Sequence, residues 1–355
     1  MRKNIFIALT ACVALAACTK NELKPVVADQ QITFQAVVNK PSTKAMIEGT
    51  TFATDSTFGT VAYKVNGSVS ELYIPISEVK YNSTGSFWST EAAYYWPKES
   101  ESTLTFYSYS PYNYSESGTK TAIPVTSTKD GLTFTNYSVK DHQATDLMVA
   151  DAKTDMTSNP NTTTSSWAAG VPTVFHHKLA QIVGINFQTV LNDANKDYAN
   201  GHDGTTGNEY EAGDKQFVIK EVSLKNFYEQ GTLTTSDDKW VTTGTATTEY
   251  KTTSSDVKLS GGTASTTSFY LVLPQTHDAE GAKLYVKYQI LTYTDATHYA
   301  TETLEATTPF ATIHGTGAAW EMNKKYTYTL KMGLDRIYWD PTVTGWEPDS
   351  ANATI

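Results

Sequence analysis

The chain has 355 residues and a formal net charge of −10 at pH 7, since its 37 acidic side chains outnumber 27 basic ones. A dispersed negative charge argues against a nucleic-acid-binding protein and against a protein held on membranes by a polybasic surface. The length suggests two domains of ordinary size. The abundance of Thr, Ser and Tyr favours strands over helices.

The first 18 residues have the pattern of a lipoprotein export signal. Arg2 and Lys3 precede the uncharged stretch Ile5–Ala17. Its roughly 13 residues fit the apolar core of a signal peptide and are too short to span a bilayer. The Leu-Ala-Ala-Cys sequence that ends at Cys18 matches the bacterial lipobox. We therefore expect cleavage of signal peptide 1–17 between Ala17 and Cys18, followed by lipid attachment to the Cys18 thiol.

The sequence contains only two cysteines, Cys12 and Cys18. Cys12 lies inside the segment that cleavage would remove, so the mature chain would keep one thiol, carrying lipid, and could form no internal disulfide. The alternative is an ordinary signal peptide with an Ala-x-Ala cleavage site and a chance cysteine. The lipobox interpretation is preferred because its four residues stand at the expected depth and in the expected order.

The first half of the chain after the signal has the pattern of an all-β domain. Residues 19–31 are polar and contain Pro25, which is typical of a flexible tether. Short alternating runs then begin with Gln31–Val38 and recur at the spacing of strands. The later runs are Thr57–Val65, Glu71–Ser77, Ser86–Pro97, Thr103–Tyr112, Leu132–Val139 and Ala144–Ala152. Residues 154–170 have no pattern and are predicted to be a linker.

The second half begins with Val171–Val190, whose central part could also form a short helical turn. On a strand, one face of this run would carry Phe175, Leu179, Val183, Ile185 and Phe187. Further strands are predicted at Gln216–Phe227, Thr267–Gln275, Ala282–Thr294 and Lys324–Met332. Two β-sandwich domains, residues 45–165 and 166–355, are the most economical architecture.

The sequence carries no pattern that indicates catalysis or metal binding. His176 and His177 are adjacent, so on a strand they would point to opposite faces and could not easily share an ion. His177 is in phase with Phe175 and is expected to be partly buried and hydrogen-bonded. The other histidines stand alone in polar stretches: His142, His202, His277, His298 and His314. Zinc, nucleophile-elbow and phosphate-binding glycine motifs are absent. We predict no enzyme, no metal and no cofactor.

Two aromatic stretches are the remaining candidates for a binding surface. Tyr94–Glu99 and Phe106–Tyr114 could stack on sugar rings. Phe106 alternates with Leu104, which instead favours packing in the core of a β-domain. We prefer the core interpretation and keep glycan binding through Tyr95 and Trp96 as the alternative.

Several stretches, taken in order, resemble those of the fimbrillins of Bacteroides-type bacteria, the type V pilins. They are the lipobox, YYWPKE from Tyr94, LTFYSYSPY from Leu104, TDLMVADAK from Thr145, FHHKLAQIVGINF from Phe175, YLVLPQ from Tyr270, WEMNKKYTYTLKM from Trp320 and IYWDPTVTGWE from Ile337. The resemblance spans nearly the whole mature chain. It is specific for the family and not for one member.

The resemblance implies a fold and a route of assembly. The fold would be two tandem transthyretin-like β-sandwich domains. The protein would be exported as an outer-membrane lipoprotein and assembled on the cell surface into fimbriae that contribute to adhesion. A surface protease would remove an N-terminal segment containing the first strand. A C-terminal strand of a neighbouring subunit would fill the open groove, since unpaired strand edges accept an extended donor.

Mapped onto this sequence, residues 18–44 would be the lipidated tether with the removable strand. That strand is Gln31–Val38, whose Ile32, Phe34 and Ala36 face one way. Proteases of the family cut after arginine, and no arginine lies nearby. Lys44–Ala45 is the best substitute, because it is polar and follows Pro41, so the cut is expected there. The alternative is a linker that stays uncut.

The C-terminal segment 336–355 is the candidate donor strand. Ile337, Trp339, Val343 and Trp346 can supply apolar anchors. Pro341 limits ordinary pairing in the middle of a sheet. An unpaired aromatic terminal strand is an apolar liability, so we expect it either to enter a neighbour or to complete its own domain.

Two functions follow from these observations. The first is a structural fimbrial subunit at the stalk, tip or base, whose partners are other fimbrial subunits, the outer membrane through lipid, and surface ligands of host or bacteria. The second is a lipoprotein that stays anchored and binds glycans. The triplets Asp55–Thr57 and Asp349–Ala351 also resemble the O-glycosylation acceptors of these bacteria, at Ser56 and Ser350.

Overall fold

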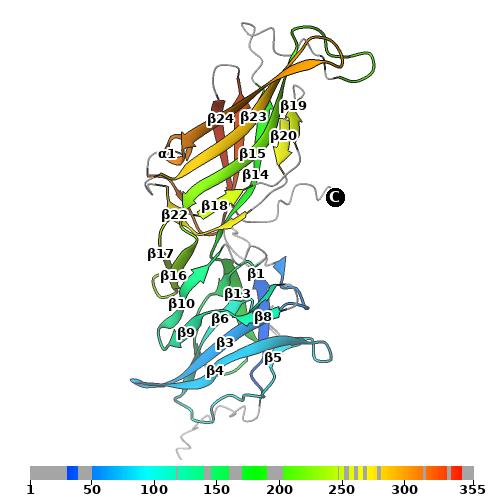
Figure 1. Cartoon of the computed structure of the whole chain (residues 1–355). Helices are drawn as coiled ribbons and strands as arrows, with labels where there is room; N and C mark the ends of the chain where they lie inside the picture. The colour runs from blue at the N-terminus through cyan, green and yellow to red at the C-terminus, as the bar shows by residue number, and fades with distance from the viewer. Residues whose placement is uncertain are drawn as a thin grey trace, which may run out of the picture.

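The computed structural model of the chain is built almost entirely of β-strands (Figure 1). The helix α1 (Phe310–His314) has five residues, and in the described part of the chain no helix is long and apolar enough to cross a membrane. The predicted all-β class is confirmed. The structure describes residues 30–38, 50–116, 119–139, 145–159, 170–189, 202, 204–246, 248–251, 256–259, 263–266, 270–277, 281–314, 317–333 and 337–345.

Some predicted features lie outside these residues. They are the signal peptide 1–17, the lipid-bearing Cys18, the Lys44–Ala45 bond and Trp346. They remain predictions.

One nine-stranded sheet organises the first half of the chain. Its strands are β1 (Phe34–Val38), β2 (Thr50–Thr51), β3 (Phe58–Asn66), β4 (Val69–Asn82), β5 (Phe87–Thr90), β6 (Thr103–Ser110), β11 (Met148–Ala150), β12 (Lys153–Met156) and β13 (Val171–His177). The order is β11-β13-β1-β5-β4-β3-β6-β12, and β11 also pairs with β6. The hydrogen-bonded path therefore closes on itself, so β1 is one strand of a closed ring and does not lie at an edge.

Aromatic side chains fill this ring. Phe34, Phe58, Phe106 and Phe175 are almost completely buried, and Trp88 joins them. Each comes from a different strand, and the alternation of a strand points every second side chain inward. This explains why β1 is held firmly: its Phe34 lies in the middle of a core that four other strands build.

The second half contains two five-stranded sheets (upper part of Figure 1). One consists of β14 (Ala180–Thr189), β20 (Thr263–Thr266), β21 (Tyr270–Val272), β26 (Lys324–Met332) and β27 (Ile337–Gly345). The other consists of β15 (Lys215–Phe227), β18 (Thr248–Lys251), β19 (Val257–Leu259), β23 (Lys283–Tyr293) and β24 (Tyr299–Pro309). Phe187 and Leu330 of the first sheet share a core with Phe217 and Leu284 of the second.

A fourth sheet, of four strands, joins the two halves. It consists of β9 (Val125–Thr128), β10 (Gly131–Ser138), β16 (Gln230–Thr234) and β17 (Lys239–Thr243). β10 of the first half pairs with β16 of the second. Two small sheets complete the fold, β7 (Asn113–Glu116) with β8 (Thr119–Ala122), and β22 (Gln275–Thr276) with β25 (Ala319–Trp320).

The run from Val171 is not one continuous strand. It forms β13 and β14, and the register of β14 against β26 shifts between Ile182 and Gly184. Val183 is the extra residue at this bulge and is 42% exposed. The expectation that Val183 shares the buried face is wrong, because a bulge turns its extra residue out of phase. Ile185 and Phe187 are buried as predicted.

The predicted division between residues 165 and 166 would place β13 in the second half. Its five paired residues from Val171 to Phe175 lie beside β1, in the sheet of the first half. The chain passes into the second half only after His177. The predicted linker is likewise shorter, since Lys153–Met156 forms β12.

Candidate functional site

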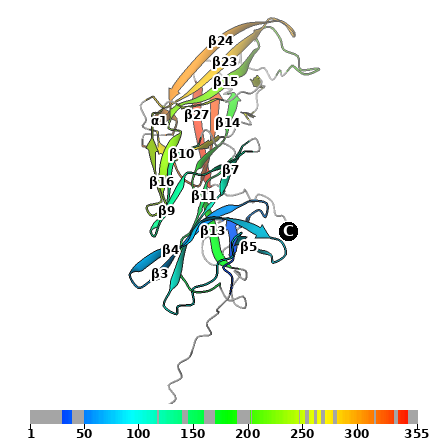
Figure 2. The ribbon, with the colours of Figure 1, turned by 60° about the horizontal axis from the view of Figure 1, so that its bottom comes forward.

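The first strand occupies a slot between two walls. β13 pairs with β1 in parallel, from Phe34 opposite Val171 to Val38 opposite Phe175. On the other side, β5 meets β1 only at Phe34 and Trp88, and β2 pairs with Val37 and Val38. In Figure 2, which brings the first half forward, β13 and β5 lie on either side of β1. Strand β1 is therefore paired along five residues with β13 on one edge, and at three positions with β5 and β2 on the other.

The inward side chains of this segment are those expected from the sequence. Ile32, Phe34 and Ala36 are 1%, 0% and 6% exposed. The Phe34 ring makes edge contacts with Phe58 and Phe106, at centroid distances of 5.8 and 5.7 Å. Such pairs add to the burial of the ring itself. Phe34 is thus the main anchor of the strand.

The beginning of the segment is held mainly through its backbone. Ile32 N donates to the Tyr94 carbonyl at 2.8 Å, and Val171 N donates to the Thr33 carbonyl at 2.7 Å. The Asn159 side-chain amide donates to the Gln31 carbonyl at 3.0 Å and to Thr33 Oγ1 at 3.2 Å. All but one of these partners on the first segment are main-chain atoms. Any extended chain could offer them.

Trp96 orients Asn159. Its indole Nε1 donates to Asn159 Oδ1 at 3.2 Å, which directs the amide nitrogen of Asn159 toward the first strand. Asn159 stands at the start of the predicted linker, where no sequence pattern singles it out. Sequence reasoning missed it, because its partners are far away in the chain.

The position of Trp96 contradicts its predicted role in the glycan-binding alternative. It is 3% exposed and packs on Phe106, so it cannot stack on a sugar. Its neighbour Tyr95 is 47% exposed. Phe106, Tyr109 and Tyr114 of the second aromatic stretch are buried, which confirms the core interpretation there.

The C-terminal strand lies at the end of its sheet. β27 pairs antiparallel with β26, from Ile337 opposite Met332 to Gly345 opposite Lys324. In this register Trp339 stands opposite Leu330. Val343 is 48% exposed. The strand thus pairs within its own chain here, and among the described strands it has one partner.

The structure confirms the expectation for His177 and corrects the one for His277 and His314. His177 is partly buried and its Nδ1 contacts Asp146 Oδ2, as predicted. His277 and His314, predicted to stand alone, lie with their Nδ1 atoms 3.0 Å apart, and His277 is 2% exposed. Strand pairing of β22 with β25 brings them together, which no local pattern reveals. Among the described residues, no three His, Cys, Asp or Glu side chains are placed to hold a metal.

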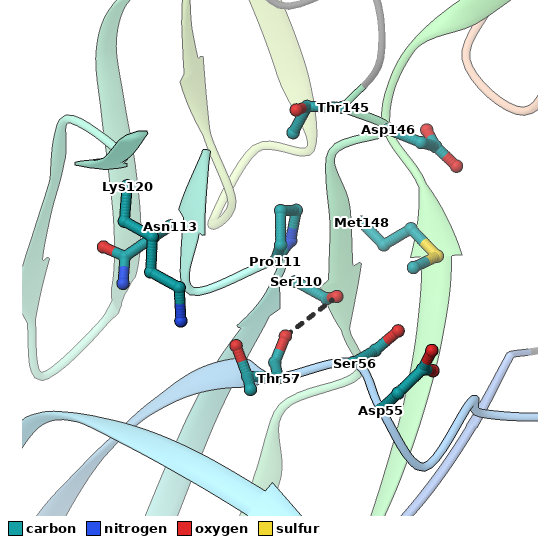
Figure 3. A pocket seen from close by; sticks show the side chains of 10 residues that line it. All are labelled: Asp55, Ser56, Thr57, Ser110, Pro111, Asn113, Lys120, Thr145, Asp146 and Met148. Carbon is teal, nitrogen blue, oxygen red and sulfur yellow. Dashed lines mark hydrogen bonds between the residues drawn. The ribbon is translucent and has the colours of Figure 1, made fainter. Parts of the chain in front are cut away.

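A polar cavity of about 400 Å³ lies beside the Asp55–Thr57 triplet (Figure 3). Asp55 and Asp146 line one side, and Lys120 lies on the other. Ser110 Oγ donates to the Thr57 carbonyl at 3.5 Å. The hydroxyl of Ser110 is therefore engaged with the backbone.

The fold and the slot define a class of two-part β-proteins that hold their N-terminal strand between strands distant in sequence. The chain belongs to the Fimbrillin-like family, whose model matches residues 43–346. This is a family of structural fimbrial and cell-adhesion proteins, and the prediction that the chain is not an enzyme is confirmed by that membership.

A solved structure shares the fold at low sequence identity. A fimbrial protein from Bacteroides vulgatus ATCC 8482 is 18% identical, with a TM-score of 0.60, and the match covers 89% of this chain and 99% of that one. A fimbrilin from Porphyromonas gingivalis W83 is 12% identical, with a TM-score of 0.43, covering 90% and 98%. No curated protein matches the chain.

Proposed function

We propose that the protein is a fimbrial subunit that is exported as a lipoprotein through Cys18 and assembles by exchange of its first strand. The observation that carries this proposal is the position of β1, bonded in parallel to β13 inside the core of the first half. Family membership supports association with other fimbrial subunits at the cell surface. The proposed architecture remains two tandem transthyretin-like domains, with β13 counted in the first.

Cleavage between Lys44 and Ala45 is the proposed trigger. β1 precedes this bond, whereas β2 follows it, so cleavage would separate β1 from the body and leave β2 behind. Loss of the first segment would uncover Phe58, Phe106 and Phe175. Burying one large apolar side chain contributes about 2 kcal/mol, so an empty slot would strongly favour a replacement strand.

The C-terminal segment is the proposed replacement. It carries Ile337, Trp339, Val343 and Trp346, and its strand β27 has an edge position from which it can leave without opening the middle of a sheet. Extended donors add to such sites through backbone hydrogen bonds, with alternate side chains filling pockets. Adhesion would then be a property of the assembled fibre and its outermost subunit.

N-terminal sequencing of polymer from cells tests the proposed cleavage. We expect the polymer to begin at Ala45, whereas a polymer that begins at Cys18 would contradict strand removal. Deletion of residues 340–355 should abolish polymerisation and leave a soluble, folded monomer. Polymers of normal length from the deleted protein would contradict the donor role.

A further inference from the structure

We propose that Gly170 and Asn159 position the main chain of whichever strand fills the β1 slot, and that the aromatic core sets the register of that strand. In the polymer, that strand would be Ile337–Val343 of a second copy, parallel to β13, with Trp339 at the position of Phe34. This inference rests on the proposed function and adds to it the two positioning residues and a residue-by-residue register.

Gly170 forms the floor of the slot at the entrance. Its backbone has a φ of +153°, and a Cβ built on it would stand 2.5 Å from Phe34 N and even closer to the carbonyl group of Thr33. Contacts this short do not occur, so any side chain at position 170 would push the first strand away from β13. Only glycine lets a strand backbone lie this close.

Asn159 holds the entrance of the slot on the same side as β13. Its amide nitrogen reaches the Gln31 carbonyl and Thr33 Oγ1, and Trp96 holds its carbonyl oxygen. Together with the bond from Val171 N to the Thr33 carbonyl, this grips two successive odd-numbered positions of the strand from the β13 side. Gly170 and Asn159 thus recognise the main chain and leave side-chain selection to the aromatic core.

The pattern of the C-terminal strand matches that of β1. The first segment reads Ile-x-Phe-x-Ala-x-Val from Ile32 to Val38, and the C-terminal segment reads Ile-x-Trp-x-Pro-x-Val from Ile337 to Val343. Each inward position of β1 has a counterpart of the same kind, including one aromatic residue at the second position. A shift of one residue would point the polar positions inward.

Pro341 fits this register although it has no N–H group. It would stand where Ala36 stands in β1. The Thr33 carbonyl points toward β13 and Ile32 N points to Tyr94, on the other side. The backbone N–H and C=O groups of successive residues in a strand point alternately toward its two neighbouring strands. The N–H of position 36 therefore points the same way as Ile32 N, away from β13. Proline there costs no hydrogen bond to β13.

The test uses the full chain with a site-specific protease sequence in place of residues 43–46, so that the protein folds intact and is cut afterwards. A fluorescent peptide of residues 335–345 then competes with the cut strand. We expect the peptide to bind the cut protein and not the uncut one. Trp339→Asp in the peptide should weaken binding at least tenfold. Asp340→Ala, at an outward position, should leave it unchanged.

The protein variants test the positioning residues. Gly170→Ala should weaken binding of the peptide at least tenfold. Asn159→Ala should weaken it about fivefold through loss of one hydrogen bond, to the Arg336 carbonyl that would replace the Gln31 carbonyl. Gly67→Ala is the control for backbone strain, because Gly67 also has a positive φ, of +58°, whereas a Cβ there meets open space. If Gly170→Ala does not fold, peptide binding by Asn159→Ala alone tests the positioning role.

Unchanged binding in the Asn159 and Gly170 variants, or equal losses from both peptide changes, would overturn the inference. Polymerisation of cut wild-type protein is followed separately. Normal polymers from the Gly170 and Asn159 variants would refute the positioning role and leave the fimbrial function standing. Peptide binding as expected, with no polymer from wild type, would refute the function and leave the slot assignment standing.

Discussion

The buried His277 and the partly buried His314 form a pair, with Nδ1 atoms 3.0 Å apart. The rings packed around His277 are those of Phe227, Phe310 and Trp320. Burial, with the neighbouring His314 as the smaller cause, lowers the pKa of His277 to about 3. Burial also lowers the pKa of His314, although Glu321 opposes this. The pair is therefore neutral at pH 7 and resists protonation.

The protein should consequently lose stability in mild acid. The pKa of His277 is about 3 in the folded state and about 6.5 in an unfolded chain, so the unfolded state binds the proton more tightly. The full stability is present above pH 6.5 and falls as the pH drops toward 3, by about 1.4 kcal/mol per pH unit for one such group. Urea unfolding between pH 7 and 4 measures this slope.

Replacing the buried imidazole tests its share of the slope. His277→Gln should flatten the dependence between pH 6.5 and 4, whatever it does to stability at pH 7. His298→Gln removes an exposed imidazole, 78% accessible, and is the comparison. If both variants keep the wild-type slope, the acid sensitivity has another source.

Trp240 connects the joining sheet to the passage between β13 and β14. Its Nε1 donates to the Lys178 carbonyl at 2.6 Å, and both residues are buried. Trp240→Phe keeps most of the ring but leaves this carbonyl without the indole donor, so the free energy of unfolding should fall by about 1–3 kcal/mol. Val241→Ala on the same strand is the control, since Val241 is 59% exposed and should change stability by less than about 0.5 kcal/mol. Equal effects in urea unfolding would contradict this role.

The strand pattern of the first half was predictable because alternation is a local property. The alternation in Gln31–Val38 predicts that Ile32, Phe34 and Ala36 point inward, and these side chains are buried. The partner of that strand was not predictable. β13 follows more than 130 residues later, and its parallel register depends on the whole ring of strands. A division at residue 165 therefore separates two segments that pair.

The polar side chains of the slot escaped prediction for a related reason. Asn159 and Gly170 flank a stretch of Thr, Ser and Asn that resembles a linker. Their roles arise from distances to Gln31, Thr33 and Phe34, which no spacing in the sequence encodes. His277 and His314 show the same limit, because β22 and β25 must pair before the rings can meet.

Substitutions at the neighbouring residues Trp96 and Tyr95 should have very different effects on the free energy of unfolding. Trp96→Ala removes a 3% exposed ring and the bond to Asn159, so it should lower the free energy of unfolding by about 3–5 kcal/mol. Tyr95→Ala should change it by less than about 0.5 kcal/mol, because its side chain is exposed. The Tyr73 hydroxyl donates to the Tyr95 backbone carbonyl, which the substitution keeps. Urea unfolding checks both values, and similar losses would refute this assignment.

Phe34→Ala is expected to free the first strand from the slot. The ring is fully buried and loses its contacts with Phe58 and Phe106, a change that costs about 3–5 kcal/mol in a core. Because Phe34 is the main apolar anchor of β1, much of this loss should appear as local opening of that strand. Hydrogen exchange at the amides of Gln35 and Val37 should therefore accelerate more than exchange in β6.

Gln35→Ala is the matched change, since Gln35 is adjacent on the strand but only partly buried. It should leave the exchange rates in β6 unchanged. The free energy of unfolding should stay within about 0.5 kcal/mol of the wild-type value. Suppose instead that Phe34→Ala accelerated exchange in β1 and β6 equally. The strand would then unfold only together with the rest of the first half. A segment that cannot open alone would be a poor candidate for exchange with a neighbouring subunit, so this outcome would weigh against strand replacement at the slot.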